Sequence, residues 1–425
     1  MENTDILISG AGIAGPALAY WLRTSGFNPT VVERAPAPRP GGQTVDLRGA
    51  GRTVIERMGL MGRARELSLD QAGIAWVNDR GRVTARMPTE LHGGEGIISE
   101  IEILRGDLGQ LLYEASRPGT EYLFDDTITG LEQDATGVSV TFEKAPPRRF
   151  DLVIGADGLH SVVRGLAFGP ESGCVRPLHA YTAWFTAPAD FDLGGWYLMH
   201  NAPGGRVVSV RPGRLPGEIK GGLSFRSEPL AYDRRDVAAQ QDLLARVFAG
   251  AGWETPRLLA AMRSASDFFF DSIGQVHLDR WSAGRAALLG DAGYCPTPLT
   301  GLGTSLALVG AYVLAGELAR ANGDHHAAFA RYEQVMRAYV TRAQQLPPGG
   351  MAGFAPRSRA LIRARDFNMR LMAHWPMRLL LAGQFSKAGD IDLPDYQVAG
   401  SGRGPGTDTR AGAGRGRGLT GDRLQ

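Results

Sequence analysis

The sequence predicts an α/β protein in which a parallel sheet is interrupted by an inserted antiparallel sheet and followed by C-terminal helices. Three observations lead to this fold class. Buried-strand patterns run directly into glycine turns at residues 6–15, 152–158 and 286–293. Short alternating strands separated by Pro/Gly turns fill residues 177–270. Helical segments rich in Arg and Met follow residue 326.

The first strand, around residues 6–8, passes into the turn GAGIAG at residues 10–15. Gly10 lets the chain leave the strand, Gly12 lets backbone N–H groups approach a pyrophosphate, and Gly15 lets the next helix pack closely on the sheet. A pyrophosphate there would lie at the N-terminus of the helix expected over residues 14–25, where an anion is favoured. The pattern is that of a Rossmann-like dinucleotide site, and the alternative is a purely structural glycine turn.

The second strand, residues 30–32, ends on Glu33 about twenty residues after the glycines. A carboxylate in this position can accept hydrogen bonds from ribose hydroxyls. An acid would repel the 2′-phosphate of NADP, so Glu33 followed by Arg34 favours FAD. The sequence therefore predicts a Rossmann-like FAD-binding domain.

A proline-rich loop at residues 35–42 leads into a strand-like stretch at 43–49 and a helix expected over 53–61. The polar side chains here, Gln43 and Asp46 among them, either line a ligand site or are solvated. Strand-like pieces fill residues 72–104. Arg105 begins the next helix, where a cation is unfavourable, so an anionic partner elsewhere is expected.

The second glycine turn follows an apolar strand at residues 152–154, which we expect beside the first strand. Asp157 in this turn is placed to cap the following helix. Arg164 is expected to pair with Asp157 or with a nucleotide phosphate.

The inserted region, residues 177–270, reads as an antiparallel sheet. One face is predicted to carry Tyr181, Trp184, Trp196, Tyr197 and Phe225. These rings form either the core of the sheet or the roof of a pocket for a flat, largely apolar ligand. His200 and Arg211 on the same strands are further candidates for that pocket.

The third glycine turn follows a buried strand at residues 286–289 and contains Asp291. An acid at the carboxyl end of a strand lies where α/β folds bind ligands. Gly301 and Gly303 then present backbone N–H groups at the start of a long apolar helix.

The composition indicates two domains and excludes little else. A chain of 425 residues with a net charge of +2 gives no sign of a nucleic-acid partner. Residues 400–425 carry five Arg and two Asp among Gly, Ser and Thr, which predicts a disordered basic tail. There is no apolar run of eighteen residues and no secretory signal pattern, so we expect a cytoplasmic protein without a membrane partner. Two cysteines are too few for a zinc site or a disulfide framework, and no metal is expected.

Three separated motifs together resemble one family. These are GAGIAG at 10–15 with Glu33, GADG at 155–158 with Arg164, and GDAG at 290–293 followed by Pro298, Gly301 and Gly303. In this order the chain resembles the class A FAD-dependent monooxygenases of the p-hydroxybenzoate hydroxylase fold. It looks closest to the polyketide-oxidising and tetracycline-inactivating branch, which has a GG-x-x-x-D-L segment like residues 41–47. The resemblance covers about residues 4–395.

The resemblance implies a division of the chain and a set of contacts. The FAD-binding domain would comprise residues 1–176 and 271–345, the substrate domain 177–270, bracing helices 346–398 and the tail 399–425. The residues implied to bind the cofactor are Gly10, Gly12, Ala14, Gly15, Glu33, Arg34, Arg105, Asp157, Asp291, Pro298, Gly301, Leu302 and Gly303. The substrate-pocket candidates are Gln43, Asp46, Trp184, Trp196, Tyr197, His200, Arg211 and Phe225. Pro298 and Gly301 would lie nearest the reacting edge of the flavin, and no catalytic base is assigned. Tyr294 and Ser305 depart from the family pattern.

The resemblance implies an enzyme that takes hydride from NADPH or NADH onto FAD and reacts the reduced flavin with O₂. One oxygen atom would pass from a flavin C4a-hydroperoxide to a polycyclic aromatic or polyketide-like substrate. The alternatives are an FAD-dependent reductase or dehydrogenase without oxygen insertion, and a non-catalytic flavin-binding partner protein. The expected state is a monomer or a homodimer.

Overall fold

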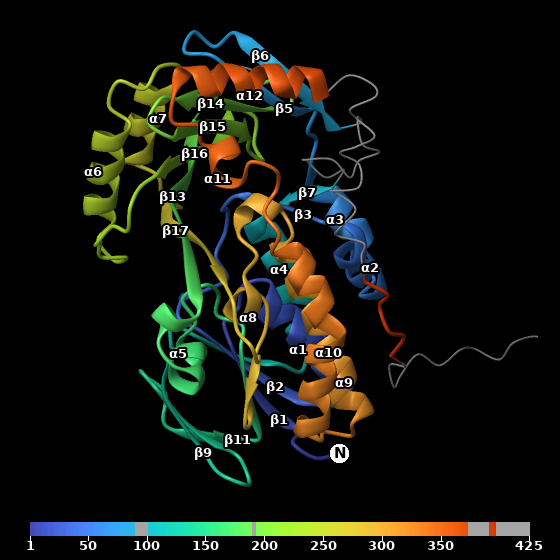
Figure 1. The fold of residues 1–425 in the computed structure, drawn as a ribbon. Helices are drawn as coiled ribbons and strands as arrows, with labels where there is room; N and C mark the ends of the chain where they lie inside the picture. The colour runs from blue at the N-terminus through green and yellow to red at the C-terminus, as the bar shows by residue number, and fades with distance from the viewer. Residues whose placement is uncertain (90–100, 189–192, 373–390, 397–425) are drawn as a thin grey trace, which may run out of the picture.

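The parallel sheet predicted around the first glycine turn is present. The computed structural model describes residues 1–89, 101–188, 193–372 and 391–396, and within them this sheet has the strand order β18-β19-β12-β1-β2-β8 (Figure 1). Its strands are β1 (Asp5–Ser9), β2 (Asn28–Glu33), β8 (Glu121–Phe124), β12 (Leu152–Gly155), β18 (Ser282–Ala283) and β19 (Ala286–Leu288). β12 pairs with β1 in parallel, which confirms the prediction that the second motif returns beside the first.

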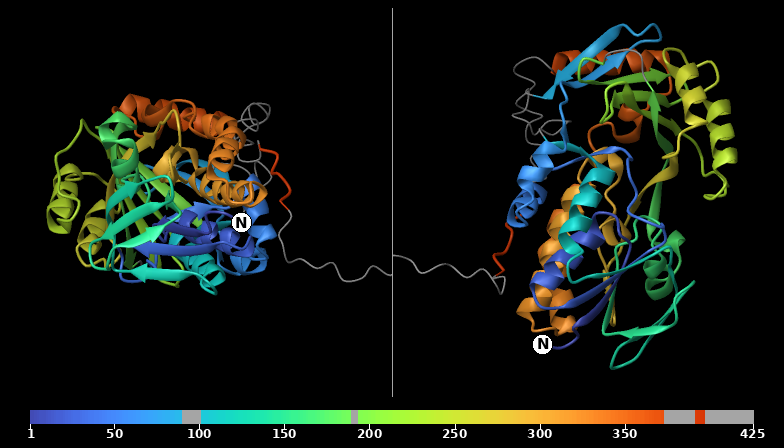
Figure 2. Two further views of the ribbon diagram at one scale, coloured as in Figure 1. Left: turned by 90° about the horizontal axis from the view of Figure 1, so that it is seen from below. Right: turned by 180° about the vertical axis from the view of Figure 1, so that it is seen from behind.

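Alternate residues of β1 point to opposite sides of this sheet and create two cores. Ile6 and Ile8 pack against helices, whereas Leu7 packs against a small antiparallel sheet. The helices are α1 (Ala14–Thr24), α2 (Gly49–Arg57), α3 (Met61–Glu66), α4 (Arg105–Ser116), α9 (Gly303–Arg320) and α10 (His325–Ala343). The small sheet consists of β9 (Ile128–Gln133), β10 (Val138–Phe142) and β11 (Arg148–Phe150), with α5 (Val162–Phe168) beside it. Seen from behind, the parallel sheet lies between these two layers (Figure 2).

A second, seven-stranded sheet lies at the other end of the molecule, in the order β17-β13-β16-β15-β14-β5-β6 (Figure 1). Its strands are β5 (Gly73–Val77), β6 (Val83–Pro88), β13 (Val175–Pro188), β14 (Trp196–Ala202), β15 (Arg206–Pro212), β16 (Glu218–Arg226) and β17 (Phe269–Val276). Every neighbouring pair is antiparallel except β14 and β5. The inserted antiparallel sheet is thus as predicted, but β5 and β6 come from the segment that the prediction assigned to the first domain. The remaining domain boundaries stay a prediction.

The two faces of the seven-stranded sheet have different coverings. The outer face packs against α6 (Val237–Val247) and α7 (Thr255–Met262) through a core that includes Phe185, Leu223 and Phe248. The inner face packs against α11 (Gly350–Phe354), α12 (Arg359–Met372) and the short helix η3 (Pro298–Thr300), which contribute Met351, Met369 and Leu299.

A third small sheet connects the two ends. It pairs β3 (Thr44–Asp46) and β4 (Ser68–Leu69) with β7 (Glu102–Leu104), which runs directly into α4. Arg105 therefore stands at the junction between this sheet and the helix.

Two local predictions are wrong. The expected helix over residues 53–61 is α2 followed by α3, with Gly59 at φ +72° between them. The strand-like stretch 43–49 is shortened to β3, because Gly49 and Gly51 already belong to α2. A Cβ on Gly51 would lie 2.8 Å from the Ser305 Cα, so this glycine serves a close crossing of α2 and α9 and not a turn.

Within the described ranges, no helix is long and apolar enough to cross a membrane. Nor do the His, Cys, Asp and Glu residues of that part of the chain gather into a group that could hold a metal ion. The predicted basic tail lies outside the described residues.

Candidate functional site

The first glycine turn is built so closely that side chains are excluded. A Cβ on Gly10, which has φ +101°, would lie 2.7 Å from the carbonyl oxygen of Ala156 in the second motif. A Cβ on Gly15 would collide with the carbonyl oxygen of Gly10. Ala14 begins α1, so the turn presents bare backbone at the N-terminus of a helix. This is the arrangement that binds a pyrophosphate.

Glu33, at the end of β2, is hydrogen-bonded to that turn. Its Oε2 accepts a hydrogen bond from the Ala11 N–H at 2.8 Å, and its Oε1 accepts one from the Ala35 N–H at 2.9 Å. The neighbouring cation is Arg39, whose guanidinium lies 3.3 Å from Oε1, whereas Arg34 is exposed. The sequence analysis did not single out Arg39, because a cation in a proline-rich loop carries no motif.

Arg105 presents its charge to the same turn. Its backbone N–H donates to the Gln43 carbonyl at 2.9 Å, and a Cβ on Gly12 would lie 3.1 Å from its guanidinium. Burial and the nearby Arg39 lower the pKa of Arg105, against the attraction of Asp291 and Glu33. Among the described residues, no carboxylate comes within ion-pair distance of it. The Arg105 guanidinium, which lies at the unfavourable N-terminal end of α4, is therefore available to bind an anion.

Asp157 in the second motif caps α5, as predicted. Its Oδ2 accepts from the Val162 N–H at 2.8 Å and from the Ser9 hydroxyl at 3.1 Å. Burial raises the pKa of this carboxyl, although these hydrogen bonds favour its ionised form.

Arg164 does not pair with Asp157. Its guanidinium donates to the Ala292 carbonyl at 2.9 Å and to the Leu159 carbonyl at 2.5 Å, and Glu171 lies 3.8 Å away. The side chain is 1% exposed. It therefore joins the second motif to the third, and the prediction of a phosphate or Asp157 partner is corrected.

The third motif ends at α8 (Asp291–Tyr294) and the loop before α9. Asp291 is solvent-exposed, yet desolvation by the surrounding protein raises its pKa, a combination expected on the wall of a cleft. A Cβ on Gly303 would lie 3.7 Å from the Asp291 Oδ1, so the carboxyl stands beside the N-terminus of α9.

The loop between Asp291 and α9 contains an unexpected strained residue. Thr297 has φ +85° although it is not glycine, it is 2% exposed, and its hydroxyl has no hydrogen-bond partner among the described residues. Pro298 next to it is exposed, Gly301 has φ +65°, and Leu302 is buried. Strain of this kind clusters at ligand sites, and only the backbone geometry reveals it.

The two departures from the family pattern have structural reasons. The Tyr294 hydroxyl lies 2.8 Å from that of Tyr332, within the core formed with α9 and α10. Ser305 is fully buried where α2 crosses α9, and its hydroxyl donates to the Arg48 carbonyl at 3.2 Å. Both side chains are packed into the helical layer.

The aromatic face predicted on the inserted sheet is divided between two faces, because successive residues of a strand point in opposite directions. Trp184, Tyr197 and Arg211 are on the inner face, with Trp184 and Tyr197 in the core shared with Leu299 of η3. Tyr181 and Phe225 belong to the outer core.

Trp196 and His200 also point away from the inner face. His200 donates from Nδ1 to the Val77 carbonyl, 3.2 Å away, and its ring lies 6.1 Å from the outer-face ring of Trp253. Burial lowers the pKa of His200. Trp196 stacks under Arg86 at 5.0 Å. Of the pocket candidates on this sheet, the structure thus brings only Trp184, Tyr197 and Arg211 together.

Asp46 and Gln43 lie between the glycine motifs and the inner face. Asp46 pairs with Arg48 at 2.9 Å, and a Cβ on Gly301 would lie 3.1 Å from the Asp46 Oδ2. The Gln43 carbonyl receives the Arg105 N–H. Glu102, which the sequence analysis did not select, stands beside Asp46 in the β3–β7 register.

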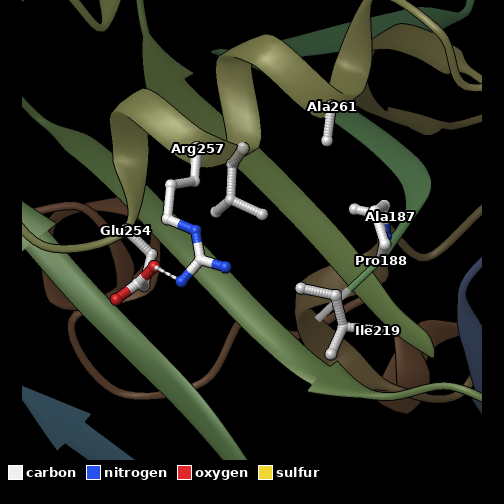
Figure 3. A pocket seen from close by; sticks show the side chains of 7 residues that line it. Ala187, Pro188, Ile219, Glu254, Arg257 and Ala261 are labelled. Carbon is white, nitrogen blue, oxygen red and sulfur yellow. Dashed lines mark hydrogen bonds and ion pairs between the residues drawn. The ribbon is translucent and has the colours of Figure 1, made fainter. Parts of the chain in front are cut away.

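A small depression on the outer side is separate from this site. It lies between α7 and the adjoining ends of β13 and β16, where Arg257 pairs with Glu254 at 3.1 Å (Figure 3). Its lining residues are Ala187, Pro188, Ile219, Glu254, Arg257, Leu258 and Ala261. None of the residues selected from the sequence belongs to it.

Comparisons with known proteins agree with this geometry. Residues 3–345 match the family model described as FAD binding domain. The chain is 46% identical over 355 residues to the uncharacterized protein Rv1260 of Mycobacterium tuberculosis, covering 83% of this chain and 94% of that protein. It is 39% identical over 344 residues to a flavin-dependent monooxygenase of Legionella longbeachae, covering 81% and 88%. The crystal structure of the tetracycline destructase Tet(51) superposes with a TM-score of 0.78 at 33% identity, covering 93% of this chain and all of that one.

Proposed function

The chain belongs to the class A FAD-binding flavin-dependent monooxygenases, and from this premise we propose that it inserts one atom of O₂ into a polycyclic aromatic or polyketide-like substrate at the expense of NADPH or NADH. Membership of an enzyme family leaves no place for the alternative of a non-catalytic flavin-binding partner. What the proposal adds is the substrate class, the reductant and the residues that serve each.

The residues present fit FAD. The observation that carries this is the bare backbone of the first turn, where any Cβ on Gly10 or Gly15 would collide with neighbouring backbone, next to an Arg105 guanidinium that has no carboxylate partner within ion-pair distance among the described residues. A dianionic pyrophosphate matches both features.

The other cofactor contacts follow the order of the motifs. In the proposal Gly10, Gly12, Ala14 and Gly15 bind the pyrophosphate, Glu33 the ribose, Arg34 the adenine side and Arg105 the ribityl and phosphate region. Asp291 binds the ribityl chain, Asp157 holds the second motif in place, and Pro298, Gly301, Leu302 and Gly303 adjoin the isoalloxazine ring. Glu33 would give up its bond to the Ala11 N–H in exchange for ribose hydroxyls.

The substrate side rests on the inner face. Trp184 and Tyr197 pack in the same core as Leu299, directly after Pro298. Two large rings beside the proposed flavin position favour a flat, polycyclic molecule over a single-ring acid. The similarity to the tetracycline destructase Tet(51) also supports a polycyclic substrate.

FAD, when bound, accepts hydride from the nicotinamide and activates O₂. This chain would bind and orient both reactants. Trp184 and Tyr197 would exclude water from one side of the substrate, and the loop from Pro298 to Gly301 would fix the distance between substrate and flavin.

The test is oxygen uptake and product mass with purified protein, NADPH or NADH, ¹⁸O₂ and a panel of polycyclic phenols. One ¹⁸O atom in a product establishes the proposal and identifies the substrate class. Substrate-linked flavin reduction without ¹⁸O in any product would favour the reductase or dehydrogenase alternative. Protein that binds no FAD would overturn the assignment of the glycine turns.

A further inference from the structure

Four charged side chains meet between the small sheet and the inner face of the seven-stranded sheet. Asp46 and Glu102 are opposite each other in the β3–β7 register. Arg48 lies 2.9 Å from Asp46, and the Arg211 guanidinium lies 3.7 Å from the Glu102 Oε2. Glu102 and Arg211 are only 4% and 8% exposed. Charges buried to this extent are costly unless they are fully paired.

Arg211 is incompletely paired. Its contact with Glu102 is longer than a hydrogen bond, and its Nε has no partner among the described residues. The guanidinium lies over the Tyr197 ring at 3.8 Å and beside Trp184 at 5.8 Å. The shortfall suggests that a ligand completes its bonding.

The neighbouring cation shows the contrast. Lys220 is the register partner of Arg211 and is equally buried. Its ammonium lies 3.0 Å from Glu218 and 3.6 Å from Asp267, and it donates to the Thr186 hydroxyl. The charge of Lys220 is neutralised by the carboxylates of Glu218 and Asp267. Arg211 has only the more distant carboxyl group of Glu102 beside it.

The surroundings of Glu102 favour its protonated form at neutral pH. Burial and the adjacent Asp46 raise its pKa to about 8, although Arg211 and Arg48 oppose the shift. The groups facing it are Asp46 and Arg48 at β3 and Arg211 on β15, while β4, on the other side of β7, contributes only Ser68 and Leu69. A neutral Glu102 leaves the positive charge of Arg211 uncompensated.

The cluster also lies where the substrate would be. The Asp46 Oδ2 is beside Gly301, which adjoins the proposed ring of the flavin, and Arg211 touches the two aromatic side chains of the inner face. A planar molecule lying against Trp184 and Tyr197 would bring its edge to the guanidinium.

We propose that Arg211 binds an ionised oxygen of the polycyclic substrate, and that the proton on Glu102 decides whether Arg211 is free to do so. The inference rests on the proposed function and names its substrate more narrowly, as a polycycle with an acidic hydroxyl or carboxyl group. When Glu102 releases its proton to solvent, its carboxylate competes for the guanidinium and the substrate anion is displaced. No bond other than the carboxyl O–H is broken.

The test uses the FAD-loaded enzyme and a probe that stays ionised throughout the titration. The binding of anthraquinone-2-carboxylate is measured by calorimetry from pH 6.5 to 9.5, with anthraquinone-2-carboxamide as the neutral counterpart. The affinity for the carboxylate should fall by about 30-fold between pH 7 and pH 9.5, since a site that titrates near 8 loses tenfold per unit above it. The affinity for the carboxamide should not change.

Two variants separate the roles. Glu102→Gln imitates the protonated acid, so the carboxylate should bind with wild-type affinity at pH 7 and without the fall at high pH. Arg211→Met should bind the carboxylate at least tenfold more weakly at every pH and no better than the carboxamide. Glu132→Gln, an exposed residue on β9, is the matched control and should keep the wild-type profile.

Three results would overturn the proposal. They are a Glu102→Gln profile that still falls above pH 8, an Arg211→Met protein that binds the carboxylate normally, and inorganic phosphate that competes as strongly as the polycycle. If the Arg211→Met protein does not fold, the pH dependence of carboxylate binding by Glu102→Gln still tests the proposal. None of these results concerns FAD content or ¹⁸O incorporation, so the failure of this inference is distinct from the failure of the proposed function.

Discussion

The glycine turns and the inner face of the seven-stranded sheet are built on opposite principles. At the turns, backbone lies against backbone: Gly10 touches the second motif, and a Cβ on Gly15 would collide with the carbonyl oxygen of Gly10. At the inner face, side chains from several strands and from the small sheet define the surface, as with Trp184, Arg211 and Glu102.

This difference suggests a division of roles, in which the turns serve the shared cofactor and the inner face serves the substrate of the individual enzyme. The backbone contacts of the turns are proposed to bind FAD, and they are present although Tyr294 and Ser305 depart from the family pattern. Because the inner face is made of side chains and the turns are made of backbone, we expect the choice of substrate to vary on a constant cofactor site.

The sharpest way to break this comparison is to add one methyl group to the first turn. Gly10→Ala should bind FAD at least 100-fold more weakly, because φ +101° costs an alanine about 1–3 kcal/mol and its Cβ meets the Ala156 carbonyl oxygen at 2.7 Å. Gly165→Ala on α5, where the Cβ meets nothing within 4 Å, is the control. FAD content by absorbance measures both. Equal FAD content would show that the turn is not a backbone cradle.

Arg105→Met tests the cation that is proposed to bind the phosphates of FAD. A charge-assisted hydrogen bond contributes about 1.5–3 kcal/mol, so FAD affinity should fall by about 10- to 100-fold. Thermal stability without FAD should be unchanged or higher, since Arg105 makes no ion pair within the described residues. The control is Arg263→Met, which removes an exposed pair with Asp242. Unchanged affinity in fluorescence titrations would remove Arg105 from the site.

The sequence predicted the turns well because each constraint lies within a few residues. The strand, the glycines and Glu33 form one local pattern, and the close contacts around Gly10 and Gly15 are what that pattern requires. Arg39 and Thr297 were not predicted as site residues, because neither has a residue type or a spacing that belongs to a known motif. Their roles arise from loop geometry, which a single sequence does not specify.

The inner face was predicted only in part. The two-residue period of a strand directs Trp196 and Tyr197 to opposite faces, so the prediction of both on one face is wrong. Glu102 is different, since its chemistry depends on its register with Asp46 and on Arg211 more than a hundred positions away. Such long-range pairing is decided by tertiary packing and leaves no local trace.

Gly222→Ala tests whether the inner face can change without the turns. A Cβ there would collide with the Ser209 hydroxyl and lie 2.6 Å from the Trp184 ring, so both side chains must move. The value of kcat/KM for the substrate should fall about tenfold, as for a displaced pocket side chain costing about 1.4 kcal/mol, while FAD affinity stays constant. Gly62→Ala on α3, with open space at its Cβ, should change neither quantity. If Gly222→Ala also lost FAD affinity, the inner face and the turns would not be independent of each other.

The smallest expected effect concerns the residue that connects the two regions. His160, after the second motif, lies 3.0 Å from Glu171 and 2.9 Å from Asp271 on β17. Burial lowers the pKa of His160, but the hydrogen bonds with Asp271 and Glu171 outweigh this effect and raise the pKa above its usual value.

A histidine whose pKa is raised in the folded state stabilises the protein fully below the unfolded pKa of about 6.5. This stabilisation is lost as pH rises through the folded pKa. His160→Gln should therefore cost about 1 kcal/mol at pH 6 and progressively less at higher pH, followed by thermal unfolding from pH 5.5 to 9. His179→Gln, whose imidazole is 51% exposed beside Glu228, should cost nothing measurable. A loss from His160→Gln that is equal at every pH would mean that the imidazole joins the two regions by packing and not by its charge.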